Sequence, residues 1–318
     1  MANIFLTTTC RITSYNPLAF RNFELVLNLS ECDHQKKHHV VDCPTDADLI
    51  LFVCDRRFYH SGIYSSEIFK KYPEKSLVLD FVDRTIPRIP GLYATIPSYL
   101  QKYPIYEYLF YPYNYGCFDI EGAIAAFSDY KYLFSFIGNV NTCPTLRSNV
   151  VNLLHPRAYL RDTSKEASVE LFSDVLMSSK FVLCPRGIAA STIRVYEAMR
   201  AGRVPVIISD EWQGNIIDED WKEFSIIIPE KDVALIPTIL EASESKAIEM
   251  GEKARLVWEK NFSMSYGFHW IVEACLRIQR LRTDYKRVSS RKIYTETFGT
   301  THFVPFWKEF IRGKLGRI

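Results

Sequence analysis

Short apolar runs alternate with amphipathic stretches along most of this 318-residue chain. Such runs, separated by segments of helix length, predict βαβ units and a mainly parallel sheet. In the first part they are Asn3 to Leu6, Phe23 to Leu27, Leu49 to Val53, Ser76 to Leu79 and Ile105 to Leu109. A turn-rich break at residues 111–116 and a connector at residues 121–130 indicate where the first domain ends.

A second series of the same kind begins with the apolar run from Leu133 to Ile137. It continues through Val150 to Leu154, a helix from about Ser164 to Ser178, a strand from Ser225 to Ile228, a helix from Val233 and another from Ala247 to Trp258. We therefore predict an α/β protein with two Rossmann-like domains, at residues 1–125 and 126–275, followed by a tail at residues 276–318.

The stretch from Phe181 to Asp210 predicts a strand, a glycine loop, a helix and a second strand. Its second strand, Val204 to Ile208, is rich in β-branched residues, as buried parallel strands are. Ser191 or Thr192 can cap the helix, and Gly202 stands where a left-handed residue ends one. The positive end of the helix then lies over the carboxyl edge of the sheet, which suits a phosphate.

Arg194 and Glu197 are three residues apart and share a face of this helix. Arg194 could hold a diphosphate while Glu197 accepts hydrogen bonds from ribose hydroxyls. The pair could equally be an ordinary helix salt bridge that contributes about 0.2–0.5 kcal/mol. The loop has neither a G-x-G-x-x-G nor a Walker pattern, so spacing leaves both interpretations open.

The same stretch resembles the C-terminal signature of exostosin-like glycosyltransferases, family 47 (GT47). The matching residues are Cys184-Pro-Arg-Gly187, Ser191, Arg194, Glu197-Ala198, Gly202, Val204-Pro205-Val206-Ile207, Ser209-Asp210, Trp221 and Phe224-Ser225. Upstream, Leu133-Phe-Ser-Phe-Ile-Gly138-Asn139, followed by Arg147, is similar to the strand and turn that open the family's nucleotide-binding domain. The resemblance is specific from about Leu133 to Leu240.

The resemblance implies the GT-B architecture, with two Rossmann-like domains facing a cleft. It implies an inverting hexosyl- or pentosyltransferase of glycan biosynthesis that moves a sugar from a nucleotide donor, with a UDP-sugar expected, to a glycan hydroxyl. A helix N-terminus and basic side chains are expected to stabilise the leaving diphosphate, so no metal and no cofactor beyond the donor is predicted. The expected nucleotide-sugar-binding residues are Arg147, Arg186, Gly187, Ser191, Arg194, Glu197 and Asp210.

Arg147 and Asp210 also have structural interpretations, as Arg194 and Glu197 do. Arg147 could be a surface arginine at the start of a helix, and Asp210 could cap the turn that follows its strand.

An inverting transfer also needs a general base. Asp83 is our first candidate and Asp80 the second, because they follow the strand Ser76 to Leu79 at its carboxyl edge.

Alternatives to these catalytic assignments remain. Asp83 and Asp80 could instead cap the loop before Pro87, and Glu121 and Asp55 are weaker base candidates. For the acceptor, Tyr93 and Tyr113 are candidates because aromatic rings suit the apolar faces of sugars. Aromatic residues in such a stretch can equally fill a core.

Composition narrows the class of protein. With 47% hydrophobic and 24% charged residues, the chain is typical of a globular protein. No apolar run approaches the ~20 residues of a transmembrane helix, and the N-terminus does not resemble a signal peptide. Eight scattered cysteines without C-x-x-C pairs predict reduced thiols, a cytoplasmic location and no zinc site of that kind. The polar run containing Asp33, His34, His38 and His39 looks like a metal cluster, but it has no second ligand group at a defined spacing and is interpreted as a solvated loop.

The tail at residues 276–318 carries eleven Lys and Arg residues against three acidic ones. Its last stretch, Phe306 to Ile318, could lie on a membrane surface as an amphipathic helix or pack back on the N-terminal domain. The tail has no nucleic-acid-binding motif, so nucleic acid is not an expected partner. A catalytically degenerate module that binds a glycan or nucleotide is the main alternative, and the sequence leaves the oligomeric state open.

Overall fold

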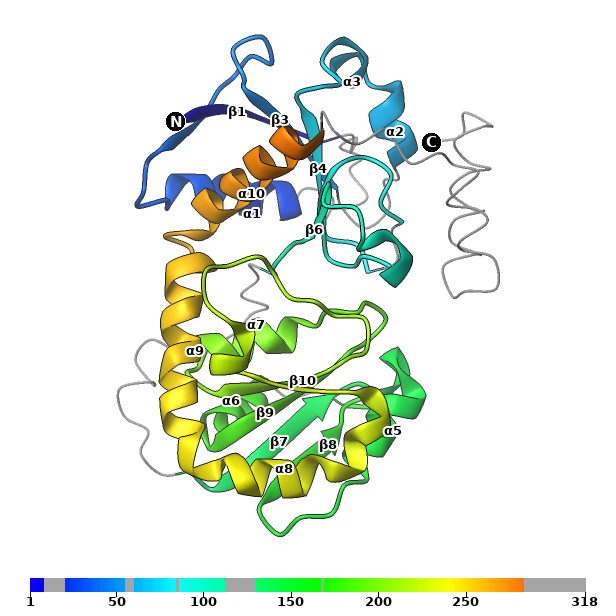
Figure 1. The fold of residues 1–318 in the computed structure, drawn as a ribbon, viewed down its shortest axis with the longest axis vertical. Helices are drawn as coiled ribbons and strands as arrows, with labels where there is room; N and C mark the ends of the chain where they lie inside the picture. The colour runs from blue at the N-terminus through cyan, green and yellow to red at the C-terminus, as the bar shows by residue number, and fades with distance from the viewer. Residues whose placement is uncertain (9–20, 55–59, 84–85, 112–129, 167–168, 283–318) are drawn as a thin grey trace. The chain divides into compact units, whose positions relative to one another are not determined.

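The computed structural model describes residues 1–8, 21–54, 60–83, 86–111, 130–166 and 169–282 (Figure 1). The chain divides into two compact units: unit 1 comprises Met1–Pro112 and Met264–Ile318, and unit 2 comprises Tyr113–Ser263. Each unit has a parallel sheet and flanking helices, so the predicted α/β class with two domains is confirmed. The structure assigns residues 264–275 to unit 1, whereas the sequence grouped them with the second domain.

Unit 1 contains a six-stranded parallel sheet in the order β2-β1-β3-β4-β5-β6. Its strands are β1 Ala2–Thr7, β2 His38–Val40, β3 Leu49–Cys54, β4 Ser76–Asp80, β5 Gly91–Tyr93 and β6 Tyr106–Tyr108. Its helices are α1 Arg21–Glu31, α2 His60–Ser65, α3 Glu67–Lys71 and α10 Gly267–Arg282, with a 3₁₀ turn at Ser98–Leu100. Strands β3 and β4 are buried throughout, which explains their unbroken apolar sequences.

The predicted strand from Phe23 to Leu27 is wrong, because this segment lies inside α1. The buried residues of α1 are Asn22, Val26 and Leu29, spaced as the buried stripe of a helix. A short apolar run has no clear period of its own. The helical spacing of buried residues over the whole of α1 decided the conformation of the segment.

Unit 2 contains a five-stranded parallel sheet in the order β11-β10-β9-β7-β8. Its strands are β7 Tyr132–Gly138, β8 Ala158–Asp162, β9 Ser179–Pro185, β10 Val204–Ile208 and β11 Ile226–Ile228. Its helices are α5 Pro144–Val151, α6 Val169–Met177, α7 Ile193–Arg200, α8 Ile236–Ser243 and α9 Ala247–Asn261 (Figure 1). The 3₁₀ turns are Val140–Thr142, Trp221–Glu223, Glu230–Leu235 and Glu244–Lys246.

The strand order of unit 2 reverses between β7 and β9. From β7 the chain first goes to β8 on one side and then returns to β9 on the other. Connections therefore leave neighbouring carboxyl ends in opposite directions and open a crevice there. This topological switch point is where open α/β sheets bind ligands.

One predicted element of unit 2 needs correction. The run from Val150 to Leu154 does not form a separate element, because Val150 and Val151 end α5 and a turn follows. The next element is the edge strand β8, whose residues are only partly buried or exposed. An edge strand lacks the continuous apolar sequence on which the prediction relied.

None of the helices in the described part of the chain combines the length and apolar character that a membrane-spanning segment needs. The basic tail, apart from its first residues in α10, lies outside the described residues. The predicted amphipathic stretch from Phe306 to Ile318 therefore stays a prediction, as does its packing on the N-terminal domain.

Candidate functional site

Helix α7 is closed at its carboxyl end and uncapped at its amino end. Gly202 adopts a positive φ of 66°, and Arg203 N–H donates to the carbonyl of Ala198 at 2.9 Å. Gly202 N–H donates to the carbonyl of Met199, and the two bonds together form a Schellman motif. The glycine at this position had predicted such a helix end. Thr192 occupies the N-cap, but its side chain makes no capping hydrogen bond. The amino end of α7 therefore keeps its partial positive charge.

Two buried hydroxyl groups near this end of the sheet have no hydrogen-bond partner among the described residues. Ser191, immediately before the N-cap, is 4% exposed, and Ser209, immediately after β10, is 5% exposed. Buried hydroxyl groups are rarely left unpaired, so a partner outside the protein chain is a natural explanation. Ser191 is one of the predicted donor-binding residues.

Arg147 joins the two strands at the switch point. It comes from α5 and donates to three carbonyl groups: Asn139 after β7, Pro185 at the end of β9 and Arg186 directly after it, each at 3.0 Å. The residue is only 9% exposed, which excludes the surface-arginine interpretation. Burial, followed by the charge of Arg194, lowers the pKa of Arg147 to about 10, so it remains protonated at neutral pH.

Gly187 allows the loop after β9 to approach this guanidinium. A Cβ atom at Gly187 would lie 3.2 Å from Nη2 of Arg147 and 3.4 Å from Oγ1 of Thr142. The separation from Arg147 is tighter than an ordinary van der Waals contact. The close approach leaves the backbone of the loop beside a buried positive charge.

Arg194 reaches the same strand ends from α7. Its Nη1 donates to Oε2 of Glu197 at 2.5 Å, and its Nη2 donates to the carbonyl of Ile137 in β7 at 3.1 Å. The guanidinium also lies 3.7 Å from the ring centre of Phe172. The helix salt bridge therefore exists, and it orients Arg194 toward the carboxyl end of β7 instead of leaving it in solvent.

Arg186 belongs to a second polar group that contains Glu230, a residue not predicted from the sequence. Arg186 forms a two-point ion pair with Glu230, at 2.5 and 3.1 Å. This hydrogen bonding raises the pKa of Arg186. The available signal for Glu230 was its position just after β11, at the same edge of the sheet.

Asp210 is tied to Glu230 through the backbone. Glu230 N–H donates to Oδ1 of Asp210 at 2.9 Å, and Asp210 N–H donates to Oε1 of Glu230 at 3.3 Å. Glu230 begins a 3₁₀ turn that follows β11, so Asp210 bonds to a turn distant in the chain and does not cap the turn after its own strand, which was one of its two interpretations. Arg186, Asp210 and Glu230 thus connect the ends of β9, β10 and β11.

The candidate general bases in unit 1 differ in burial. Asp83 is exposed, and the hydroxyl of Tyr111 donates to its Oδ1 at 3.3 Å. Asp80 is 1% exposed, and its Oδ1 accepts the N–H of Val82 at 2.8 Å. Only an accessible carboxylate can reach a substrate hydroxyl, so the geometry favours Asp83. The alternative candidates Asp55 and Glu121 lie outside the described residues.

Tyr93, a predicted acceptor contact, lies fully buried in unit 1, and its hydroxyl donates to the carbonyl of Ile89 at 2.5 Å. It is a core residue, as the alternative interpretation held, and it offers no surface to an acceptor in this structure. The other predicted acceptor residue, Tyr113, lies outside the described residues.

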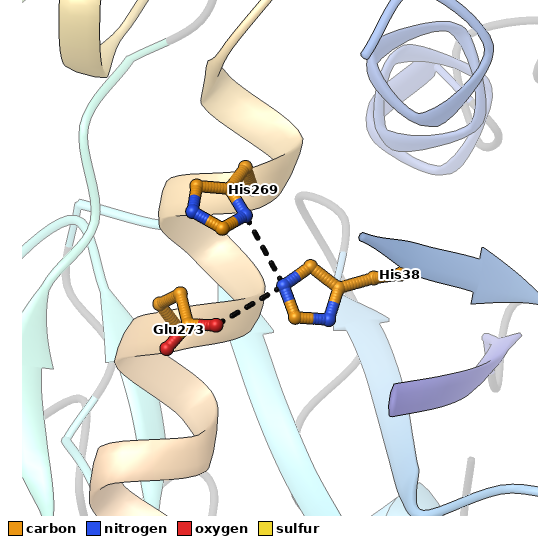
Figure 2. A group of neighbouring side chains, drawn as sticks. All are labelled: His38, His269 and Glu273. Carbon is orange, nitrogen blue, oxygen red and sulfur yellow. Dashed lines mark hydrogen bonds and ion pairs between the residues drawn. The ribbon is translucent and has the colours of Figure 1, made fainter. Parts of the chain in front are cut away.

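The polar histidine run is not a uniformly solvated loop. His34 and His39 are exposed as expected, but Asp33 and His38 are buried. Asp33 accepts the N–H groups of Gln35 and Lys36 and so closes the turn. His38 begins β2 and contacts His269 and Glu273 of α10 (Figure 2). The spacing of residues in the sequence could not predict this group, because His38 and His269 are 231 positions apart.

The topology and side chains of unit 2 define a Rossmann-like unit with a polar, arginine-rich edge at its switch point. A family model, the exostosin GT47 domain, matches residues 122–243 of this unit. The family resemblance recognised in the sequence is therefore confirmed for this part of the chain. The match includes β7 to β11 and all seven predicted donor-binding residues.

Relatives with curated names match this chain over stretches of 90 and 162 residues. An exostosin-1 homolog of Caenorhabditis elegans is 34% identical over 90 residues, which is 28% of this chain and 24% of that protein. A glucuronosyltransferase from Oryza sativa subsp. japonica, named as probable, is 26% identical over 162 residues, covering 48% of this chain and 36% of its own length. The chain thus spans about a quarter to a third of these relatives.

Solved structures with similarity to the chain include TarM, with 14% identity, a TM-score of 0.38 and coverage of 80% of this chain and 57% of TarM. Anabaena HepE in complex with UDP has 9% identity and a TM-score of 0.37, with coverage of 90% and 100%. The assignment of two parallel α/β units depends on the sheet topology of the chain itself.

Proposed function

We propose that the protein is an inverting glycosyltransferase of the GT-B type, which moves a sugar from a UDP-sugar to a hydroxyl group of a glycan acceptor. One observation carries the proposal: Arg147 and Arg194 bond to the carboxyl ends of β7 and β9 at the switch point, inside the stretch matched by the exostosin GT47 domain. Ligands of open α/β sheets bind at such a point, and arginines there suit a diphosphate.

In this proposal the diphosphate binds between the amino end of α7 and the loop of Gly187. Arg147 and Arg194 stabilise the charge that grows on the leaving diphosphate, without a metal ion. Arg147 has a particular advantage, since its three hydrogen bonds all go to carbonyl groups and do not neutralise its charge. The hydroxyl of Ser191 donates to a phosphate oxygen, which gives this buried group its partner.

The remaining donor contacts are assigned by chemistry. Glu197 accepts hydrogen bonds from ribose hydroxyls while it keeps Arg194 oriented. Arg186 and Asp210 are both bonded to Glu230 at the ends of β9 and β10. In this proposal they bind the donor sugar or hold the loops of the donor site in place.

Asp83 acts as the general base. Its carboxylate takes the proton of the acceptor hydroxyl as that oxygen forms a bond to the anomeric carbon. The bond from the anomeric carbon to the diphosphate breaks, and its electron pair leaves with UDP. Tyr111, which donates to Asp83, orients the carboxylate in the free protein.

We also propose a reducing, cytoplasmic location. The described cysteines, Cys32, Cys43, Cys54, Cys143, Cys184 and Cys275, are all free thiols. Burial raises the pKa of Cys184 and Cys275 far above the ordinary thiol value, which keeps these two protonated and unreactive.

The experiment that tests the function is a binding and turnover series. Calorimetry with UDP, GDP and CMP should show selective binding of UDP, and Arg147→Ala should weaken that binding. UDP release is then followed with UDP-sugars and a glycan acceptor mixture. Release that depends on acceptor supports the enzyme. UDP binding without acceptor-dependent release of UDP from any donor contradicts it and favours the binding-module alternative.

A further inference from the structure

Three possible metal ligands converge in unit 1, far along the chain from the residues of the proposed donor site (Figure 2). Nε2 of His38 lies 3.2 Å from Nδ1 of His269 and 3.2 Å from Oε1 of Glu273. The three ligand atoms all lie within 4.8 Å of one another. His38 begins β2, whereas His269 and Glu273 are four residues apart on α10 and therefore on one face of that helix.

We propose that His38, His269 and Glu273 bind a divalent transition-metal ion, with zinc as the expected ion. Two imidazole nitrogens and one carboxylate oxygen are a known zinc ligand set, with the fourth position left for water. Zinc–ligand distances near 2.0–2.1 Å in a tetrahedral site place ligand atoms about 3.3 Å apart. The two distances from His38 already agree with that value, and the third distance, between His269 and Glu273, is no more than 4.8 Å.

Burial prepares His38 for this role. Its side chain is almost fully buried, so the ring cannot turn freely into solvent. The neutral imidazole is the form that binds metals. The side chain of Glu273 is 45% exposed, which leaves a route for an ion and a water molecule.

The hydrogen bond and ion pair of His38 also mark the position that a cation would occupy, between His38 and α10. In the metal-free state, a proton on Nε2 of His38 can be shared by Nδ1 of His269 and Oε1 of Glu273. Nδ1 of His38 is buried without a hydrogen-bond partner among the described residues. Within the described part of the chain, the hydrogen bond and ion pair of this ring are both directed at α10. When a metal ion binds, the ring proton of His38 moves from Nε2 to Nδ1, so that the neutral imidazole offers its Nε2 lone pair and the ion engages all three ligand atoms at once.

Such a site would fasten α10 to the edge of the sheet. Strand β2 has three residues and pairs with β1 at the end of the six-stranded sheet. The opposite half of α10 is already held by Arg277, which forms a two-point ion pair with Glu107, and by Arg282, which donates to the carbonyl of Ser76. The metal would supply a corresponding attachment for the first half of the helix.

The test uses the purified 318-residue chain after treatment with a chelator and dialysis. Calorimetry with Zn²⁺ should give one ion per chain, and Co²⁺ should give the visible absorption bands of a tetrahedral site. Glu273→Gln changes an accessible helix residue and should preserve the fold. It should weaken Zn²⁺ binding by more than the about 10- to 100-fold that is typical for loss of an outer-shell partner. His269→Asn should do the same.

His39→Asn is the matched control, because this exposed histidine follows His38 in the same strand. It should bind Zn²⁺ and Co²⁺ as the unaltered protein does. Circular dichroism of each variant verifies the fold. Absence of a Co²⁺ spectrum in the unaltered protein, or a spectrum unchanged in Glu273→Gln and His269→Asn, overturns the proposal. So does equal loss of binding in His39→Asn.

Discussion

Two arginines at opposite edges of the unit 2 sheet, Arg147 and Arg157, have different kinds of partner. At the carboxyl edge, Arg147 donates to three carbonyl groups, at the same edge as the uncapped end of α7 and a Ser191 hydroxyl with no hydrogen-bond partner among the described residues. At the amino edge, Arg157 pairs with Glu244, and both nitrogens of the pair bond at 2.7 Å. Arg147 thus keeps its charge unneutralised at the carboxyl edge, where we propose that an anion binds, whereas Arg157 completes an ion pair at the amino edge.

The difference follows from parallel strands. All carboxyl ends lie at one edge, so the loops and helix amino ends that can receive an anion collect there. Lys180, at the start of β9, also pairs with Glu244 at 2.7 Å and adds to a group of charges whose partners are within the protein. The histidine group of unit 1 also begins at the amino end of a strand, and we assign it a fastening role.

The largest effect should come from Asp83→Asn. Removal of the base should lower kcat about 10²- to 10⁴-fold, while UDP binding stays unchanged because the donor residues belong to unit 2. Measurement of turnover together with UDP calorimetry checks both. Asp42→Asn, another exposed aspartate after a strand of the same sheet, is the control. Normal turnover of Asp83→Asn would reassign the base to another carboxylate.

Arg194→Ala should lower kcat/KM about 10²- to 10³-fold, as expected when one preorganised group that stabilises leaving-group charge is removed. Its fold should persist, since the lost helix ion pair is a small part of the stability. The control is Arg157→Ala, which removes the arginine of an ion pair from the opposite edge. If both variants lower kcat/KM equally, the functional distinction between the edges is incorrect.

Gly187→Ala should weaken UDP binding about tenfold, or about 1.4 kcal/mol, because the new Cβ lies 3.2 Å from Nη2 of Arg147. Gly202→Ala is a contrasting variant at the other end of α7. Its positive φ of 66° should make the fold about 1 kcal/mol less stable without changing UDP affinity. Calorimetry and urea unfolding separate the effects, and unchanged UDP affinity of Gly187→Ala would argue against a phosphate in this loop.

The smallest effect should come from Glu244→Gln, at less than about 1 kcal/mol of unfolding free energy at pH 7, because the ion pair is near the surface. Hydrogen bonds from Arg157 and then Lys180 lower the pKa of Glu244 from 4.5 to about 2. Its contribution is therefore fully present above pH 4.5 and is lost as the pH falls toward 2. Urea unfolding at several pH values should show the unfolding free energies of the unaltered protein and Glu244→Gln converging as the pH falls toward 2. A difference between the two free energies that stays constant with pH would contradict the prediction.

Local features of the proposed donor site could be predicted well. The strand–helix–strand unit, the left-handed Gly202 and the shared face of Arg194 and Glu197 each depend on a few neighbouring residues. The prediction failed for Phe23 to Leu27, where a short apolar run lies on a helix. It missed Glu230, whose partner Arg186 is 44 positions away in the chain.

The sequence by itself determined the parallel α/β class, the limits of most strands and the loop that precedes α7, because these follow from hydrophobic period and turn chemistry. Only the tertiary structure decided that Arg147 is buried against carbonyl groups 38 and 39 positions away. It also brought His38 to His269 across 231 positions. Strand order and helix packing create such contacts, and no local spacing in the chain encodes them.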